Sequence, residues 1–318
     1  MILVTGANGQ LGRRIVQHLI AREPSLLDGG LGVSVRDAAR ANELASRGVI
    51  VRQADFDQPD SLAAAFAGIR RLVLVSTDGP AAQRSARHRR AIDAALAAGV
   101  SHILYTSFLG ADCPTELAVA HRDTEAALEH SGVAHTVLRN TLYADDLRYL
   151  AEPALTHGVL RLPAGAGRVS LVSRDELAQA IAAATLAPRL DKRVYELTGQ
   201  AAFPYADIAA RIARVSGRPL SYEDVSVDAY AGSLVARGVP AWHADAQAGL
   251  FASVAAGLLA AVSHDFAALV GHPPKSLDCL IHEYFAPRSP APPQAAPRRC
   301  GCSGASRSPS SGSTGRSR

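Results

Sequence analysis

The sequence predicts an α/β protein with a doubly wound parallel sheet and a smaller, mixed, mainly helical lobe toward its C-terminus. Three observations support this class. An apolar strand opens the chain and leads through glycines into a helix, apolar runs then alternate with helical patterns as far as residue 143, and strands become shorter and rarer afterwards. The 318 residues, 48% hydrophobic and 19% charged, are enough for a large buried core.

The opening stretch, residues 1–12, carries three glycines spaced three apart, Gly6, Gly9 and Gly12. The first glycine permits a tight turn, the second lets backbone N–H groups approach a pyrophosphate, and the third allows close packing of helix on strand. A glycine pattern alone also fits a simple turn, but here a strand precedes it and a second strand, 31–36, follows at βαβ spacing. We therefore predict a Rossmann-type dinucleotide site that includes Gly6, Ala7, Asn8, Gly9, Gln10 and Leu11.

The following segments alternate in the same way. Further strands are predicted at 49–53, 71–76, 102–107 and 135–138, and helices at 37–47, 59–67, 83–98 and 116–130. Ligands of parallel sheets bind beyond the carboxyl ends of the strands. The strand ends therefore add Ser76, Thr77, Thr106 and Ser107 to the expected cofactor site.

The second half contains fewer strand patterns. We expect a strand at 169–172, a helix at 173–186 whose capping box is Ser173 and Glu176, a strand at 193–197, a helix at 205–215 and a strand at 220–223. The predicted domains are 1–143, which binds NAD(P), and 144–286, a substrate-side lobe from which parts of 169–197 can return to the first sheet. Residues 287–318, rich in Arg, Ser, Pro and Gly, are predicted to be disordered.

Charge is distributed unevenly. The net charge is +4, but six arginines and no acids follow residue 287, so residues 1–287 carry 27 basic and 29 acidic groups. We therefore expect no nucleic-acid surface on the folded body. No apolar stretch reaches membrane-spanning length, and a strand already begins at residue 1, which argues against a signal peptide; we expect a cytoplasmic protein. Four irregularly placed cysteines predict neither a disulfide framework nor a metal site.

The residues after the second and third strands bear on the choice of nucleotide. Arginine at the end of the second strand pairs with a 2′-phosphate, whereas an acid there binds a free 2′-OH. Arg36 comes first and Asp37 is placed to cap the next helix, which favours NADP (NADPH); the alternative is that Asp37 holds the ribose. Asp55 and Phe56 suit the adenine, although a loop aspartate and a core phenylalanine are the alternative.

The expected chemistry follows from the absence of a tyrosine–lysine pair at the usual spacing. Short-chain reductases commonly use a tyrosine with a lysine four residues later, but the two lysines, Lys192 and Lys275, have no tyrosine at that spacing. Hydride addition to a quinone gives a stable hydroquinone anion, so orientation would matter more than acid catalysis. A quinone is therefore a fitting acceptor.

Several motifs together resemble the NmrA-like atypical short-chain reductases, and within them the bacterial NADPH:quinone oxidoreductases of the second type. They are TGANGQLG (5–12), VRQADF (51–56), QR and HR (83–84 and 88–89), AAGV (97–100), YTS (105–107), SGVAHTVLRNTLY (131–143), HGV (157–159), VYELTG (194–199) and GHP (271–273). The resemblance implies NADPH held by the glycine loop, Arg36 and residues 76–77. It also implies a nicotinamide and quinone site at Asn140 and Tyr143, while Thr141 and Leu142 depart from the family pattern and leave the acceptor open.

His121 begins the helix that supplies the lysine in dyad enzymes, so it is a third candidate catalytic residue beside Asn140 and Tyr143; a surface histidine is the alternative.

Two functions compete. One is hydride transfer from NADPH to a small-molecule quinone-like acceptor, and the other is a non-catalytic NADP-sensing regulator. An epimerase or azoreductase is a third possibility, and the protein is expected to be a monomer or homodimer.

Overall fold

The computed structural model describes residues 1–190 and 192–287. Residues 1–286 form one compact unit. Apart from Pro287, the segment predicted to be disordered, 287–318, lies outside the described residues.

The main sheet is parallel throughout. Among the described residues it has seven strands in the order β10-β6-β5-β4-β1-β2-β3. Its strands are β1 (Ile2–Thr5), β2 (Leu31–Val35), β3 (Ile50–Gln53), β4 (Arg71–Val75), β5 (His102–Phe108), β6 (Ala134–Asn140) and β10 (Val194–Leu197). Strand β10 returns from the second half of the chain and pairs with β6, Val194 opposite Val137. The carboxyl ends of β1, β4, β5 and β6 therefore meet at one edge.

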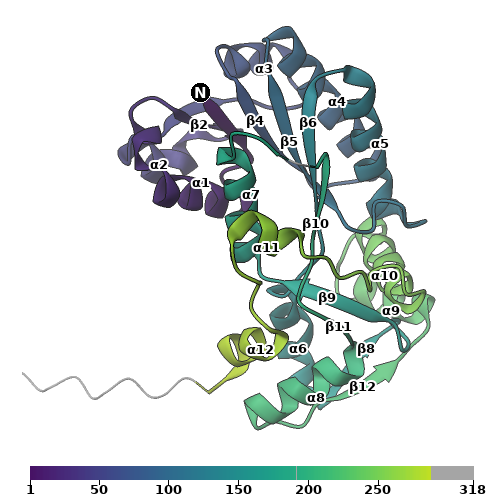
Figure 1. The fold of residues 1–318 in the computed structure, drawn as a ribbon. Coiled ribbons are helices and arrows are strands. Elements are labelled where there is room, and N and C mark those ends of the chain that lie inside the picture. Colours follow the sequence, from purple (N-terminus) through teal and green to yellow (C-terminus); the bar gives the residue numbers. More distant parts are fainter. Residues whose placement is uncertain (191, 288–318) are drawn as a thin grey trace, which may run out of the picture. The chain divides into compact units, whose positions relative to one another are not determined.

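Helices cover both faces of this sheet (Figure 1). One face carries α1 (Gln10–Arg22), the 3₁₀ helix η1 (Pro24–Leu27), α2 (Asn42–Ser46), α7 (Arg174–Leu186) and α11 (Asp265–Val270). The other carries α3 (Pro59–Phe66), α4 (Ala81–Ala97) and α5 (Glu116–Ser131). Ile15 and Leu19 of α1 share one core cluster with Ile181 of α7, and Phe66 and Ile92 belong to the cluster on the opposite face.

The second lobe has its own core and two small sheets. One sheet joins β7 (Leu142–Tyr143), β9 (Arg168–Val172) and β11 (Ala202–Pro204), and the other joins β8 (Val159–Leu162) and β12 (Ser221–Asp224). Its helices are α6 (Asp146–His157), α8 (Tyr205–Ser216), α9 (Val227–Ala236), α10 (Ala241–Ala255) and α12 (Leu277–Phe285). A core centred on Ile208, Phe251 and Ile281 packs these elements together.

The predicted fold class and the capping box at Ser173 and Glu176 are confirmed. The helix predicted at 37–47 is wrong in its first part. The Asp37 carboxylate accepts a hydrogen bond from the Ala39 N–H at 3.0 Å and begins the 3₁₀ helix η2 (Ala38–Ala41), after which α2 is short. Helix α6 was not predicted at all, because it contains Pro153, a residue that usually ends helices.

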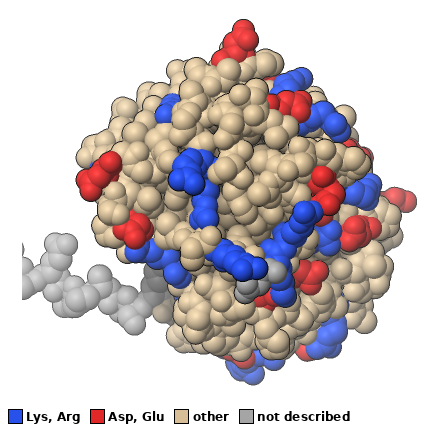
Figure 2. All heavy atoms as spheres, turned by 45° about the horizontal axis from the view of Figure 1, so that its top comes forward, with Lys and Arg blue, Asp and Glu red and all other residues tan. Residues whose placement is uncertain are grey.

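The surface of the described residues carries both signs of charge. Figure 2 shows acidic side chains lying between basic ones across the same face of the molecule. Several form ion pairs, such as Arg193 with Glu129 and Arg87 with Asp57. No helix within residues 1–190 and 192–287 combines the length and the apolar character that a membrane crossing requires.

Candidate functional site

The glycine loop connects β1 to α1 at the carboxyl edge of the sheet. Gly6 has φ +65°, a conformation that side-chain-bearing residues rarely adopt. A Cβ at Gly12 would lie 2.4 Å from the Gly6 carbonyl oxygen, so only glycine lets the helix pack this closely. Gly9 caps α1 without any side-chain hydrogen bond, which leaves first-turn N–H groups open to an anion.

The remaining loop residues contribute in different ways. Ala7 and Leu11 are buried, so neither presents its side chain to a ligand. Asn8 donates from its side-chain nitrogen to the Asp37 carbonyl at 2.9 Å and thereby ties the loop to the end of β2. Its Oδ1 atom is buried without a partner in the described residues, as expected where a bound ligand would complete the site.

Arg36 and Asp37 have separate tasks at the end of β2. The Asp37 carboxylate is engaged by the Ala39 N–H, whereas the exposed Arg36 guanidinium forms no ion pair in the described part of the chain. Arg36 is thus the charged side chain left available to a nucleotide at this strand end.

The adenine side differs from the prediction. The Asp55 carboxylate accepts from the Asp57 N–H at 3.0 Å and shapes its own loop. Phe56 is buried in the core cluster with Leu62 and Phe66, because the chain after β3 turns inward to meet α3. The expectation that its ring packs beside the adenine is therefore corrected in favour of the core alternative.

Buried side chains bind the backbone N–H groups of Ser76 and Thr77. The Ser76 N–H donates to the Thr106 hydroxyl and the Thr77 N–H donates to His88 Nε2, both at 2.9 Å. Burial lowers the pKa of His88 to about 3, so this ring is a neutral acceptor. Thr106 therefore supports the cofactor loop without facing a ligand itself.

Arg84 is the central residue of this buried layer, and the sequence indicated it only as part of the QR motif at 83–84, without a role. The side chain is 5% exposed and donates to the carbonyl oxygen of Thr77 at 2.8 Å and to the Ser76 hydroxyl at 3.1 Å. It also donates to His121 Nε2 at 2.8 Å. No carboxylate forms an ion pair with it among the described residues. Burial lowers its pKa, yet a guanidinium remains charged.

His121 is neither on the surface nor open to the cavity. Since Arg84 can only donate, His121 Nε2 must accept, and the proton lies on Nδ1, 2.9 Å from the Tyr105 hydroxyl. Burial holds the pKa of His121 well below its ordinary value. With both nitrogens engaged, the geometry makes His121 a support for Arg84 and corrects the expectation of a proton donor.

Ser107 also has a structural partner. Its hydroxyl donates to the Glu125 carboxylate, which pairs with Arg139 at 2.6 Å. The pair holds β5 and β6 against α5 and leaves Ser107 without a free hydroxyl proton for a ligand. Thr106 and Ser107 thus stabilise the edge at which the cofactor is expected.

Asn140 and Tyr143 lie where β6 leaves the sheet. Asn140 is 3% exposed, and neither of its amide atoms has a well-aligned hydrogen bond in the described residues, although the Tyr143 hydroxyl lies near. Desolvation raises the pKa of Tyr143, and the Arg174 guanidinium, 4.4 Å from the ring centre, opposes this shift. The phenol is therefore neutral, and a buried amide is left for a ligand to satisfy.

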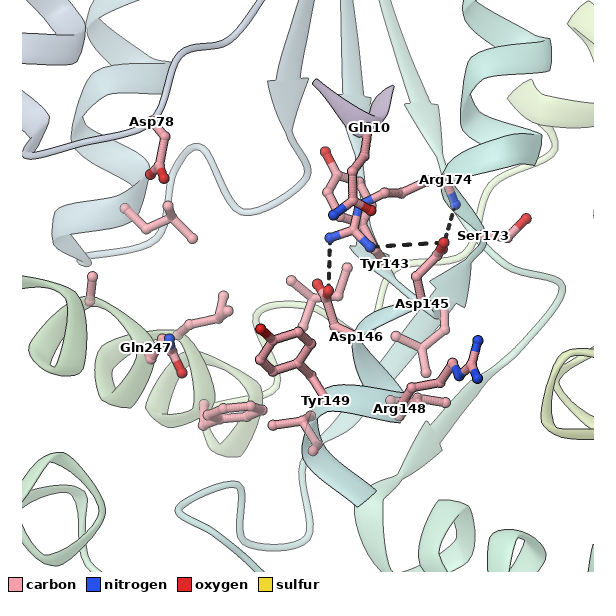
Figure 3. Close-up of a pocket in the computed structure, with 18 of the residues that line it drawn as sticks. Gln10, Asp78, Tyr143, Asp145, Asp146, Arg148, Tyr149, Ser173, Arg174 and Gln247 are labelled. Carbon is pink, nitrogen blue, oxygen red and sulfur yellow. Dashed lines mark hydrogen bonds and ion pairs between the residues drawn. The ribbon is translucent and has the colours of Figure 1, made fainter. Parts of the chain in front are cut away.

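Arg174, which sequence analysis missed, fixes the Tyr143 ring. It forms an ion pair with Asp146 at 2.7 Å, while its backbone N–H donates to the Asp145 carboxylate at 2.7 Å (Figure 3). Its position at the start of α7 gave no sign that it would reach across to β7.

A cavity of about 1290 Å³ extends from the glycine loop into the second lobe. Gln10, Tyr143 and Arg174 lie toward one end of this cavity, called here its inner part, and Tyr149 of α6 and Gln247 of α10 lie toward the other, its outer part (Figure 3). Arg84 also lines the cavity. Ligand pockets commonly measure about 300 to 1,000 Å³, so the space admits the nicotinamide half of a dinucleotide together with a second molecule. The orphaned Asn8 and Asn140 atoms and the close Gly6–Gly12 packing fit a bound dinucleotide.

Comparison with known proteins assigns the fold to a family. Residues 6–188 match the NAD(P)H-binding family. The chain belongs to this family. It is 36% identical over 286 residues to quinone oxidoreductase 2 of Escherichia coli, covering 90% of this chain and 99% of that protein. An NmrA-like family domain-containing oxidoreductase of Aspergillus flavus is 28% identical over 235 residues, 72% of this chain and 75% of that protein, and the resemblance to NmrA-like reductases is thus confirmed.

Solved structures support the same family assignment. The Escherichia coli NADPH-dependent quinone oxidoreductase in complex with NADPH superimposes with a TM-score of 0.85 at 36% identity, covering 90% of this chain and 100% of that one. Triphenylmethane reductase of a Citrobacter species in complex with NADP(H) gives a TM-score of 0.83 at 32% identity, with 89% and 100% covered. An NAD(P)H azoreductase of Xenophilus azovorans is 30% identical over 255 residues, 79% of this chain and 86% of that protein.

Proposed function

We propose that this chain is an NADPH-dependent oxidoreductase that transfers hydride to a quinone or a similar small-molecule acceptor, in the cytoplasm. The observation that carries the proposal is the cavity that runs from Gln10 in the glycine loop past Tyr143 into the second lobe. A dinucleotide on the loop would present its nicotinamide to that space. The similarity to quinone oxidoreductase 2 supports the same conclusion.

The overall reaction consumes NADPH, a quinone and one proton and yields NADP⁺ and a hydroquinone. NADPH supplies the hydride when bound. The side chains near Tyr143 contribute orientation, because no tyrosine–lysine pair is present to relay protons. Lys192 and Lys275 are instead paired with Asp265 at 2.5 Å and with Glu283 at 2.6 Å.

Each proposed binding residue has a distinct task. The backbone of residues 6–11 and the N-terminus of α1 would receive the pyrophosphate, and Arg36 would pair with the 2′-phosphate. The buried Asn140 amide would anchor the carboxamide of the cofactor or the acceptor, since its amide atoms need partners. Tyr143, held by Arg174, would form a wall against which the acceptor lies.

Arg84 would act on the charge that develops during the reaction. The acceptor becomes negative as it receives hydride, and a buried cation whose described hydrogen-bond acceptors are all neutral favours negative charge in the adjoining cavity. Its own N–H groups are largely occupied by the protein. We therefore assign Arg84 an electrostatic role and not a direct contact with the acceptor.

The proposal is tested by following NADPH absorbance with a panel of quinones, with NADH in parallel. Turnover with at least one quinone, and a lower KM for NADPH than for NADH, is the expected result. Tight NADPH binding without turnover of any quinone would overturn the enzymatic function and favour a protein that senses NADP without reacting.

A further inference from the structure

The outer part of the cavity contains an aromatic side chain that the fold itself does not use. Tyr149 on α6 is 87% exposed, yet it lines the cavity, where its ring projects between α6 and α10 (Figure 3). Its hydroxyl makes no hydrogen bond with any described residue. A large, exposed ring at a cavity wall with no hydrogen-bond partner in the described residues is available to a ligand.

The wall on the α10 side contains a pair of stacked rings. Trp242, 38% exposed, stacks on His243 with ring centres 5.1 Å apart and an interplanar angle of 18°. Gln247, one helical turn later, lies 3.0 Å from His243 Nε2 and fixes that ring. The three side chains all line the cavity that contains Tyr149.

The charged residues of α6 that line this part of the cavity are paired with opposite charges. Asp146 is paired with Arg174, and Arg148 is paired with Glu152. Leu142, Leu250 and Phe251 line the cavity between the two aromatic walls. With apolar side chains between two aromatic walls, this part of the cavity favours the flat, apolar rings of a ligand.

We propose that Tyr149 and the Trp242–His243 stack form a subsite for the outer rings of flat, multi-ring aromatic acceptors, while the reacting ring lies at Tyr143. The proposal rests on the proposed function, whose acceptor it specifies. A single-ring quinone at Tyr143 would leave the outer walls uncovered, whereas a fused three-ring quinone extends from the inner toward the outer part of the cavity.

The test compares phenanthrenequinone, with three fused rings, and duroquinone, a single-ring quinone that carries no ring hydrogen and so does not alkylate the exposed thiol of Cys279. Tyr149→Ala should raise the KM for phenanthrenequinone about 3- to 10-fold, the range of one stacked aromatic contact, and the KM for duroquinone less than about 2-fold. Tyr149→Phe, which keeps the ring, should behave like the wild type. Leu96→Ala, which shortens an exposed side chain on α4 outside the cavity, is the matched control.

A second readout does not depend on turnover. Trp242 is the single tryptophan of the sequence, so its fluorescence reports directly on the outer wall. With saturating NADP⁺, phenanthrenequinone should quench this fluorescence saturably, and Tyr149→Ala should weaken the apparent Kd by the same factor as the KM. Free N-acetyltryptophanamide corrects for absorption and collisional quenching. Melting temperatures check that each variant is folded.

The outcomes separate this proposal from the proposed function. Turnover of both quinones with a Tyr149→Ala variant that matches the wild type in KM and Kd would overturn the subsite and leave the function standing. Equal losses for both quinones would likewise overturn it. Saturable quenching that Tyr149→Ala weakens, without any turnover, would support the subsite while the proposed function fails.

Discussion

Gly12 provides a sharp test of the cofactor loop, because its substitution sets two effects against each other. In Gly12→Ala the new Cβ would lie 2.4 Å from the Gly6 oxygen, 2.8 Å from the Gly6 carbonyl carbon and 3.1 Å from Ala7 Cα. All three are backbone atoms, which cannot rotate away. Overpacking of this kind costs about 1 to 3 kcal/mol, while alanine gains at most about 1 kcal/mol over glycine inside a helix.

The clash should dominate, and the free energy of unfolding should fall by about 1 to 2 kcal/mol. Urea unfolding without cofactor measures this loss. Gly9→Val is the matched variant, since a Cβ there meets the Gly6 oxygen only at 3.2 Å. It should stay folded and yet lose more than about tenfold, or ~1.4 kcal/mol, in NADPH affinity by calorimetry. An unchanged stability for Gly12→Ala, or unchanged NADPH affinity for Gly9→Val, would refute the reasoning about the loop.

Three further predictions concern the nucleotide, the acceptor wall and pH. Arg36→Ala should weaken NADPH binding by about 1.5 to 3 kcal/mol, the range of a charge-assisted hydrogen bond, and leave NADH nearly unaffected; equal losses in calorimetry would contradict the 2′-phosphate role. Tyr143→Phe should keep most of kcat because the ring remains on Arg174, whereas Tyr143→Ala should lose more; equally inactive variants would make the phenol a proton donor. The pKa of His88 is lowered to about 3 in the folded protein, so between pH 6 and 4 only the unfolded chain binds a proton at this residue. The free energy of unfolding should therefore fall as the pH falls, by up to about 1.4 kcal/mol per pH unit over this interval. For His88→Gln, the free energy of unfolding should change less steeply with pH over this interval. An unchanged pH dependence would exclude His88 as a cause of the loss of stability.

The main sheet could be predicted because its signals are local. Strands such as β1 and β4 contain continuous apolar runs, and the glycines around Gly9 identify the first turn directly. Strands β7, β8 and β11 are short and exist only through pairing with distant segments, as when Leu142 lies opposite Leu171. Such pairing leaves little trace in the local sequence.

The site was predictable at its edges and not in its buried layer. Arg36 follows a strand and Asn140 ends one, so their position at the carboxyl edge could be inferred. Arg84 and His88 are one helical turn apart on α4, and their burial depends on hydrogen-bond partners in the loop after β4 and in α5 that no spacing rule identifies. Phe56 was ambiguous for a related reason, since an aromatic residue after a strand can turn either toward a ligand or into the core.

Hydride transfer itself can be measured in a single turnover. NADPH is first bound to an excess of the protein, so that each NADPH can react only once. The complex is then mixed with excess phenanthrenequinone in the absence of oxygen, and loss of NADPH and formation of hydroquinone are followed together. The proposed function predicts one hydroquinone for each NADPH consumed and a slower step when the transferred hydrogen of NADPH is replaced by deuterium. NADPH that stays bound and unoxidised after mixing, for every quinone tried, would contradict it.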